Sequence, residues 1–168
     1  MNKLFPAIMI ALCVAIGGTV GTTHAATHYV LGYSSVDSGK GLEWGGSTAY
    51  ATEWNSSIAT WNARGKVTIS ADTMFTLQDL TVSDAYSPAA SWAGVYTYKG
   101  AWSAETLQFN TYYLDRFSSA QKQNVATHEL GHSLGLAHST AGMVMYKYVS
   151  TVTALGAQDT GDYTYLYP

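Results

Sequence analysis

A short stretch in the second half of the chain carries three histidines and a glutamate at spacings that suit metal-assisted hydrolysis. His128 and His132 are four residues apart, which places them on one face of a helix with β-carbons about 6 Å apart. Two imidazoles in that arrangement can bind one zinc ion at the usual Zn–N distance of about 2.0–2.1 Å. Glu129 follows the first histidine and can reach a water on the metal without being a ligand. The pattern predicts a hydrolytic zinc site.

The residues that follow extend this site to a third histidine. Gly135 and His138 complete the pattern His-Glu-x-x-His-x-x-Gly-x-x-His. A glycine can adopt the left-handed conformation that lets the chain leave a helix and double back, which brings His138 to the ion. Glu129 is the last glutamate in the chain, which excludes a competing zinc-protease arrangement whose third ligand is a glutamate on a later helix. We therefore expect one zinc ion, held by His128, His132 and His138.

The expected chemistry is hydrolysis by an activated water. Three neutral imidazoles leave zinc its charge and one open position, which lowers the pKa of a bound water to about 7. Glu129 is the expected general base, which takes the proton and later gives it to the leaving amine. Two alternatives remain: a zinc hydrolase acting on a non-protein amide, such as one in a cell wall, and an inactive zinc-binding module. A structural module has no use for Glu129, which favours an enzyme.

The active-site motif lies inside a helix that the sequence marks clearly. Ser118-Ser119-Ala120-Gln121 fits a capping box, with Ser118 as the cap and Gln121 reaching back to it. The helix is expected to run to about Leu134 and to stop at Gly135. The two ligands at its C-terminal end are therefore held on a rigid element.

Other elements must support this helix. An apolar stripe at helical spacing predicts an earlier helix, formed around Tyr50, Trp54, Ile58 and Trp61. Ser47 is the expected cap of that helix and Gly65 its end. Short strands are expected at residues 66–70, at Leu80 and Val82, at residues 93–98 and at residues 106–112. A closing helix over residues 159–167 is expected to dock through Tyr163, Leu166 and Tyr167. Strands followed by helices indicate an α+β fold.

The N-terminus reads as an export signal. Lys3 precedes an uncharged run over residues 4–16, and small and polar residues lead to Ala25. The run is shorter than the ~20 residues needed to span a bilayer, so we expect cleavage after Ala25, with Ala26 as the alternative, and no membrane attachment afterwards. The expected domains are a signal peptide at 1–25 and a catalytic domain at 26–168, secreted to the extracellular space.

Composition bounds the remaining possibilities. The full chain carries a net charge of −3, and loss of Lys3 makes the mature chain more acidic, which argues against a nucleic-acid partner. Cys13 is the only cysteine and leaves with the signal, so the mature chain has neither a disulfide nor a thiol nucleophile. A hydrophobic content of 47% is ample for one packed core. We expect a monomer, with His28 on its surface.

The extended motif resembles that of the metzincins, and Ser139 after the third histidine resembles the matrixin branch. Metzincins carry a methionine turn beneath the metal. Met145-Tyr146 resembles the matrixin form of that turn, although Lys147 stands where proline is usual. Met143 is the alternative, but it lacks an adjacent tyrosine. The resemblance implies a secreted zinc endopeptidase with peptide or protein substrates.

The resemblance extends over residues 48–168 and implies a fold. Residues 107–110 resemble the strand before the active-site helix of small matrixin-like enzymes, and residues 158–167 resemble the family's closing helix. That helix usually carries two adjacent aspartates, of which only Asp159 is kept. The implied fold is zincin-like: a twisted, mixed five-stranded sheet with an antiparallel edge strand, an active-site helix and a C-terminal helix.

The resemblance also implies where a substrate binds and what this chain lacks. A substrate would lie along the edge strand and against the residues after the methionine turn. These positions are Ala93, Gly94, Val95, Tyr96, Tyr146 and Tyr148. Residues 84–94 contain no histidine, so the family's second, structural zinc is not expected. Calcium could bind through Asp72, Asp79 or Asp84, although scattered acids are more often solvated. The family's inhibitory propeptide cysteine is missing.

Overall fold

A computed structural model of the chain describes residues 14–15, 27–100 and 103–168. The expected signal peptide therefore lies outside the described residues, apart from a two-residue strand, β1, at Val14–Ala15. No helix in the described parts of the chain is both long and apolar enough to cross a bilayer.

One mixed sheet organises the chain, and its strands follow the order β1-β5-β6-β4-β2-β3. The strands after β1 are β2 (Gly41–Gly46), β3 (Thr68–Ala71), β4 (Leu80–Ala85), β5 (Gly94–Tyr98) and β6 (Glu105–Asn110). All neighbouring strands are parallel except β5 and β6, which pair antiparallel. The predicted five-stranded mixed sheet is confirmed, and β1 adds a short sixth strand beside β5.

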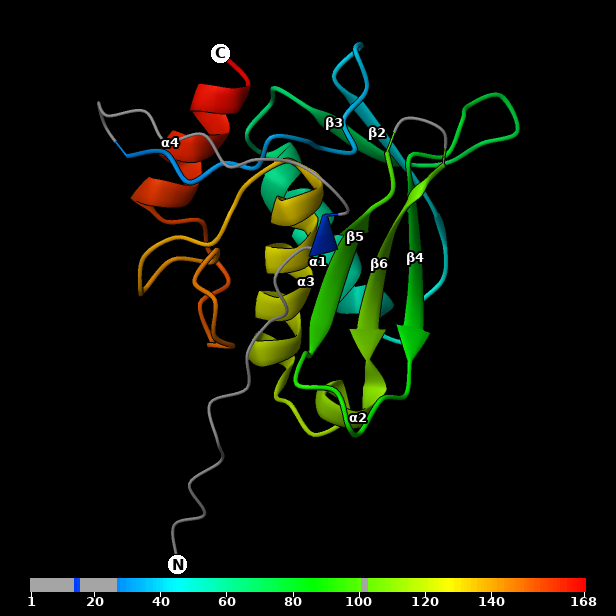
Figure 1. Ribbon diagram of the computed structural model, residues 1–168, viewed down its shortest axis with the longest axis vertical. Helices are drawn as coiled ribbons and strands as arrows, with labels where there is room; N and C mark the ends of the chain where they lie inside the picture. The colour runs from blue at the N-terminus through cyan, green and yellow to red at the C-terminus, as the bar shows by residue number, and fades with distance from the viewer. Residues whose placement is uncertain (1–13, 16–26, 101–102) are drawn as a thin grey trace, which may run out of the picture.

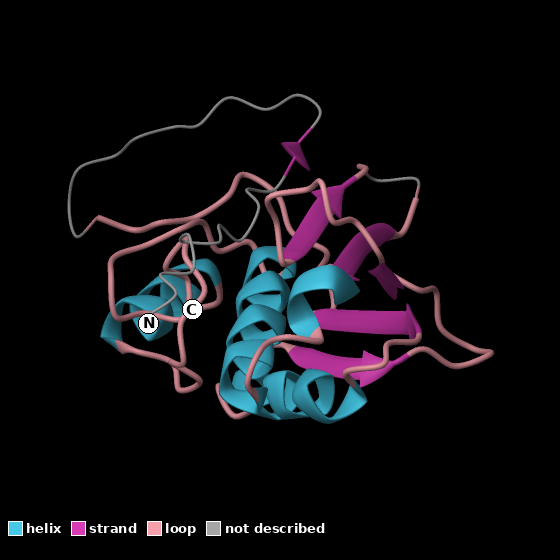
Figure 2. Cartoon of the chain, turned by 90° about the horizontal axis from the view of Figure 1, so that it is seen from below, coloured by secondary structure: helices cyan, strands magenta, loops and turns pink. Residues whose placement is uncertain are grey.

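The described residues form four helices, and the two longest cover one face of this sheet. The helices are α1 (Ala51–Asn62), the short α2 (Thr111–Leu114), α3 (Ser119–Ser133) and α4 (Ala157–Leu166). Both ribbon views show α3 between the sheet and α4, with α1 beside α3 (Figures 1 and 2). The indole N–H of Trp61 donates to the carbonyl of Thr127 over 2.9 Å and so ties α1 to α3 within the core.

The predicted capping box is confirmed. Ser118 Oγ accepts the backbone N–H of Gln121 at 3.3 Å, and Gln121 Oε1 accepts the backbone N–H of Ser118 at 3.1 Å. The predicted docking of the closing helix is confirmed as well, because Tyr163 and Tyr167 are buried. Leu166 packs against the same core while partly exposed.

Two expectations about secondary structure were wrong, and one strand was missed. Ser47 does not cap α1, whose N-cap is Tyr50; the loop before it is held instead by Asp84, which accepts the hydroxyl of Thr48 and the N–H of Ala49, both at 2.7 Å. The strand expected to reach residue 112 ends at Asn110, because the Asn110 side chain accepts the N–H of Tyr112 and starts α2. Strand β2 was not predicted from the pattern at all.

Candidate metal centre

The C-terminal half of α3 presents two buried imidazoles on one face. His128 and His132 are completely buried. The Nδ1–H of His128 donates to the carbonyl of Val144, and that of His132 donates to the carbonyl of Leu136, both at 2.8 Å. A proton held on Nδ1 leaves the lone pair on Nε2 available, so these bonds set both rings in the tautomer that binds a metal through Nε2.

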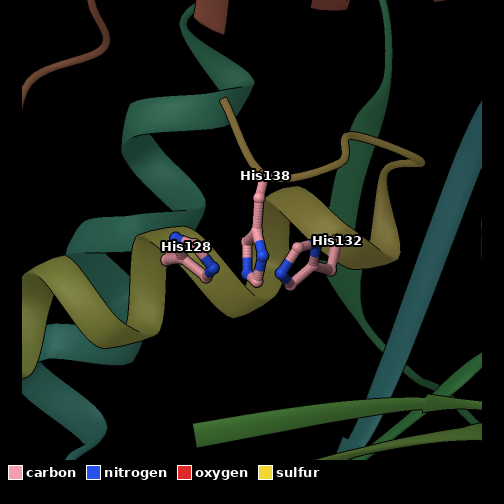
Figure 3. A group of neighbouring side chains, drawn as sticks. All are labelled: His128, His132 and His138. Carbon is pink, nitrogen blue, oxygen red and sulfur yellow. The ribbon is translucent and has the colours of Figure 1, made fainter. Parts of the chain in front are cut away.

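The turn after α3 brings in the third imidazole. Gly135 has a φ of +92°, a left-handed conformation that disfavours other residues. The chain reverses there, with the Leu136 N–H donating to the Gly131 carbonyl at 3.0 Å. His138 then lies over the helix, between the other two rings (Figure 3). The ring centroids are 5.1 Å from His138 to His128 and 5.0 Å from His138 to His132.

The cluster fits a zinc ion by the chemistry of its free atoms. One ring nitrogen from each of His128, His132 and His138 lies within 4.8 Å of the others. The Nε2 atoms of all three are buried, and none has a hydrogen-bond partner among the described residues. Buried polar atoms are normally paired, so three unpaired nitrogens facing one space are a ligand set for a cation.

The surroundings keep these imidazoles neutral, which is the state that binds metal. Burial lowers the pKa of His132 to about 3, assisted by the nearby His138. Burial also lowers the pKa of His128 well below its usual range, and the neighbouring His132 imidazole, which would repel a second proton, lowers it further. For His138, burial lowers the pKa first and the charge of Lys147 adds to it.

Glu129 shares this buried space but is held very differently from the histidines. Its side chain is completely buried, and neither carboxylate oxygen makes a hydrogen bond of normal geometry to another described residue. Burial raises the pKa of Glu129 well above its usual range, and the backbone of Tyr96 lowers it only in part. A buried carboxylate with few partners binds a proton readily, as a general base requires.

A methionine and an aspartate form the floor of the cluster. Met145 is completely buried and packs directly against Gly131, where an added β-carbon would collide with its sulfur. Met143 packs instead against Gly156. Asp159 accepts the N–H groups of Val144 at 2.9 Å, Met145 at 3.1 Å and Gly156 at 2.9 Å. Since Val144 also accepts from His128, Asp159 supports a ligand through one intervening residue.

The segment before β2 runs along the C-terminal end of α3 and is tied to it by backbone hydrogen bonds. The Leu31 N–H donates to the Gly135 carbonyl and the Ser35 N–H to the Ser133 carbonyl, both at 2.7 Å. His28, expected at the surface, is partly exposed, and its ring lies 3.0 Å from Asp162 and stacks on Tyr165. It remains outside the histidine cluster, as the ligand assignment requires.

The second acid of α4 is therefore Asp162, which the sequence pattern did not identify. Asp162 Oδ1 also accepts the backbone N–H of Tyr29 at 3.2 Å and the side chain of Gln158 at 2.8 Å. The carboxylate is buried and ties the N-terminal segment to α4. Its partners His28 and Tyr29 are more than a hundred residues away in sequence, so spacing alone could not reveal these contacts.

The six positions suggested for substrate contact fall into two groups. The side chains of Ala93, Val95 and Tyr96 are buried, so these positions can offer a ligand only their backbone. β1 pairs with Thr97 and Tyr98 and lies on the same edge. The aromatic rings of Tyr146 and Tyr148 pack edge to face at 5.5 Å, just after the methionine turn.

The acidic residues considered for calcium do not come together. Asp72 accepts the hydroxyl of Thr76 at 2.6 Å, and Asp79 accepts the N–H of Glu43 at 2.8 Å. Asp84 holds the loop before α1. Within residues 27–100 and 103–168, the histidine cluster is the one group of three or more metal-binding side chains. Calcium takes six to eight oxygen ligands, which these separate carboxylates do not gather.

Comparison with known proteins agrees with the geometry. A family model described as Matrixin matches residues 24–168, a span that includes the histidine cluster and every element of the fold except β1. A search of the curated proteins finds no match.

Proposed function

The chain belongs to the matrixin family of zinc metallopeptidases, and from that premise we propose that it is a secreted endopeptidase with Glu129 as its general base. The observation that carries the proposal is the buried group of unpaired atoms: three imidazole Nε2 atoms beside a carboxylate that makes no regular hydrogen bond to the described residues. A purely structural metal site has no use for that carboxylate.

Each residue of the site has a defined task in this proposal. His128, His132 and His138 hold the zinc through Nε2, and the Nδ1 bonds of the first two keep their rings in place. When bound, zinc supplies Lewis-acid chemistry: it lowers the pKa of water to about 7 and polarises a carbonyl. Glu129 accepts the proton of the attacking water on a carboxylate oxygen and passes it to the departing amine.

Met145 and Asp159 have supporting tasks. Met145 fills the floor beneath α3, and Asp159 fixes the backbone that carries it. We assign the methionine turn to Met145 and not to Met143, because Met145 is the one that packs against α3 at Gly131. The proposal gives neither Met145 nor Asp159 a contact with the substrate.

The proposed substrate is an extended peptide that pairs with the backbone of β5. The side chains of Val95 and Tyr96 are buried, which leaves the main chain of this part of the strand as the recognition element. Tyr146 and Tyr148 would line the pocket for the residue after the cleaved bond. The short strand β1 occupies part of the same edge at Thr97 and Tyr98. Removal of residues 1–25 as an export signal would take β1 with it and leave this edge to the substrate.

The proposal is tested with mature protein beginning at residue 26, expected to be a monomer. Casein digestion should proceed with zinc and stop with a chelator, and metal analysis after dialysis should give one zinc per chain. Casein that stays intact while an isolated cell-wall peptide amide is cleaved would instead support a non-protein zinc hydrolase. Zinc binding without hydrolysis of either would indicate an inactive module, and two zincs per chain would contradict the single-site assignment.

A further inference from the structure

Gly94, the first residue of β5, lies directly against the proposed general base. A β-carbon built on Gly94 would be 2.6 Å from Cγ and 2.9 Å from Oε1 of Glu129, and 2.8 Å from Cγ1 of Val125. Real β-carbons essentially never approach other heavy atoms within 3.0 Å. Position 94 must therefore lack a side chain as long as Glu129 keeps its present place.

The backbone itself does not require glycine at this position. The glycines with a left-handed φ are at other positions: Gly46, Gly65, Gly100, Gly135 and Gly142. Gly94 pairs with Phe109 in an antiparallel ladder, where glycine weakens a strand because it has no side chain to pack. Its contribution is space between β5 and α3, and the Glu129 side chain fills that space.

We propose that Gly94 is a positioning residue for Glu129: it lets β5 approach α3 closely enough to fix the carboxylate next to the three imidazoles. The inference rests on the proposed role of Glu129. An added β-carbon would push the carboxylate away from its position or push β5 away from α3. The helix has little freedom to yield, because Thr127 is bonded to Trp61 and the neighbouring side chains of α3 are buried.

The direct test is Gly94→Ala in zinc-loaded protein. Misplacement of a catalytic group by about 1 Å can cost on the order of 10²-fold in rate, so kcat should fall about 10- to 100-fold. Zinc content should stay at the wild-type value, because no ligand is touched, and KM should change by a smaller factor than kcat. Gly161→Ala, in α4, is the matched control: an added β-carbon there meets nothing within 4 Å, so activity should be unchanged. Parallel loss of zinc and activity in Gly94→Ala would overturn the proposal.

The added β-carbon also meets Val125, so a second variant is needed to distinguish displacement of Glu129 from a clash with Val125 in the core. Val125→Ala removes the Cγ1 atom and relieves only that contact. If the Glu129 contact causes the loss, Gly94→Ala/Val125→Ala stays as slow as Gly94→Ala. Recovery of kcat in the double variant would mean that Gly94 serves core packing, and the proposal would be wrong.

A stability cycle tests the contact without using activity. Gly94→Ala should lower the Tm of the wild-type background but have a much smaller effect in a Glu129→Ala background, where Cγ and Oε1 are gone. If Gly94→Ala does not fold alone, folding of the double variant would support the contact equally well. Equal destabilisation in both backgrounds, or failure to fold in both, would overturn it. Wild-type-like activity of Glu129→Gln would reject the proposed function instead, and the cycle would still report on the contact.

Discussion

Two carboxylates near the histidine cluster are completely buried, but their surroundings are opposite. Asp159, in the support beneath the cluster, accepts three backbone N–H groups, from Val144, Met145 and Gly156. Glu129, at the cluster itself, has two oxygens without a regular hydrogen bond to the described residues. The first group is satisfied by the fold, whereas the second is left available.

This difference separates support from chemistry. A buried charge costs stability unless hydrogen bonds compensate it, so an uncompensated carboxylate is retained only where it has another use. The imidazoles repeat the distinction within single rings. In His128 and His132, Nδ1 is bonded to a backbone carbonyl while Nε2 has no partner among the described residues. In each ring, Nδ1 fixes the imidazole to the backbone, and Nε2 remains available to bind a metal.

The largest expected effect comes from removing a ligand. His138→Ala should abolish proteolysis and weaken zinc binding strongly, because two histidines from one helix turn remain to hold the ion. Zinc affinity is measured by competition with a chromogenic chelator. Unchanged affinity would show that the third ligand is misassigned and that His138 has a structural role.

Glu129→Gln should lower activity without lowering stability. Replacement of a supporting residue should do the reverse. Turnover should fall by ~10²–10⁴, the usual contribution of a positioned general base. Zinc content should be unchanged, and Tm should stay the same or rise, because a poorly compensated buried charge is removed. Peptide hydrolysis, metal analysis and thermal unfolding of the same sample provide the test. A large drop in Tm would mean that Glu129 is a structural carboxylate.

Asp159→Asn should show the converse pattern. The amide replaces a carboxylate that accepts three N–H groups, and hydrogen bonds to charged groups are worth ~1.5–3 kcal/mol each. We expect the free energy of unfolding to fall by about 3 kcal/mol, with the folded, zinc-loaded fraction retaining most of its kcat. Urea unfolding and active-fraction kinetics measure the two quantities. A loss of kcat larger than that of Glu129→Gln would break the comparison.

The pH below which zinc is lost is expected to shift by a smaller amount, and it tests the burial of the three imidazoles. Imidazoles with lowered pKa values stay neutral in more acidic solution, so protons should compete with zinc only well below the ordinary value of about 6.5. Dialysis across a series of pH values, followed by metal analysis, should find zinc retained at about pH 5.5. Half-loss of zinc near the ordinary histidine pKa would show that the cluster is not desolvated as described.

His28→Ala should have the smallest effect. It removes one of the partners of Asp162 and the ring that stacks on Tyr165, far from the zinc ligands. Stability should fall by about 1 kcal/mol, and zinc affinity should be unchanged. Chemical denaturation combined with chelator competition tests both points. Equal loss of zinc in His28→Ala and His138→Ala would contradict the ligand assignment.

The sequence was most informative where chemistry and local structure share one short segment. The capping box of α3, Gly135 and the three histidines lie within about twenty residues, so helical periodicity and the glycine turn predicted their arrangement. Supports built from distant segments were not predictable in this way. Asp162 meets His28 across most of the chain, and β2 is half glycine with only two alternating apolar residues, Leu42 and Trp44, which is too short a pattern to mark a strand. Gly94 was expected from the resemblance only as a substrate contact, because its approach to Glu129 depends on the packing of β5 against α3.

The position of α4 has a consequence for how the enzyme is made. All three histidines precede α4 in the chain, whereas the carboxylate that fixes the floor beneath them is at Asp159. The Tyr167 hydroxyl, still later, donates to the carbonyl of Leu134 at 2.7 Å and holds the end of the helix that carries two ligands. During synthesis the ligands therefore emerge from the ribosome before their support does. The metal centre reaches its final form only after residue 167 has emerged, so its assembly must wait until α4 can fold against α3.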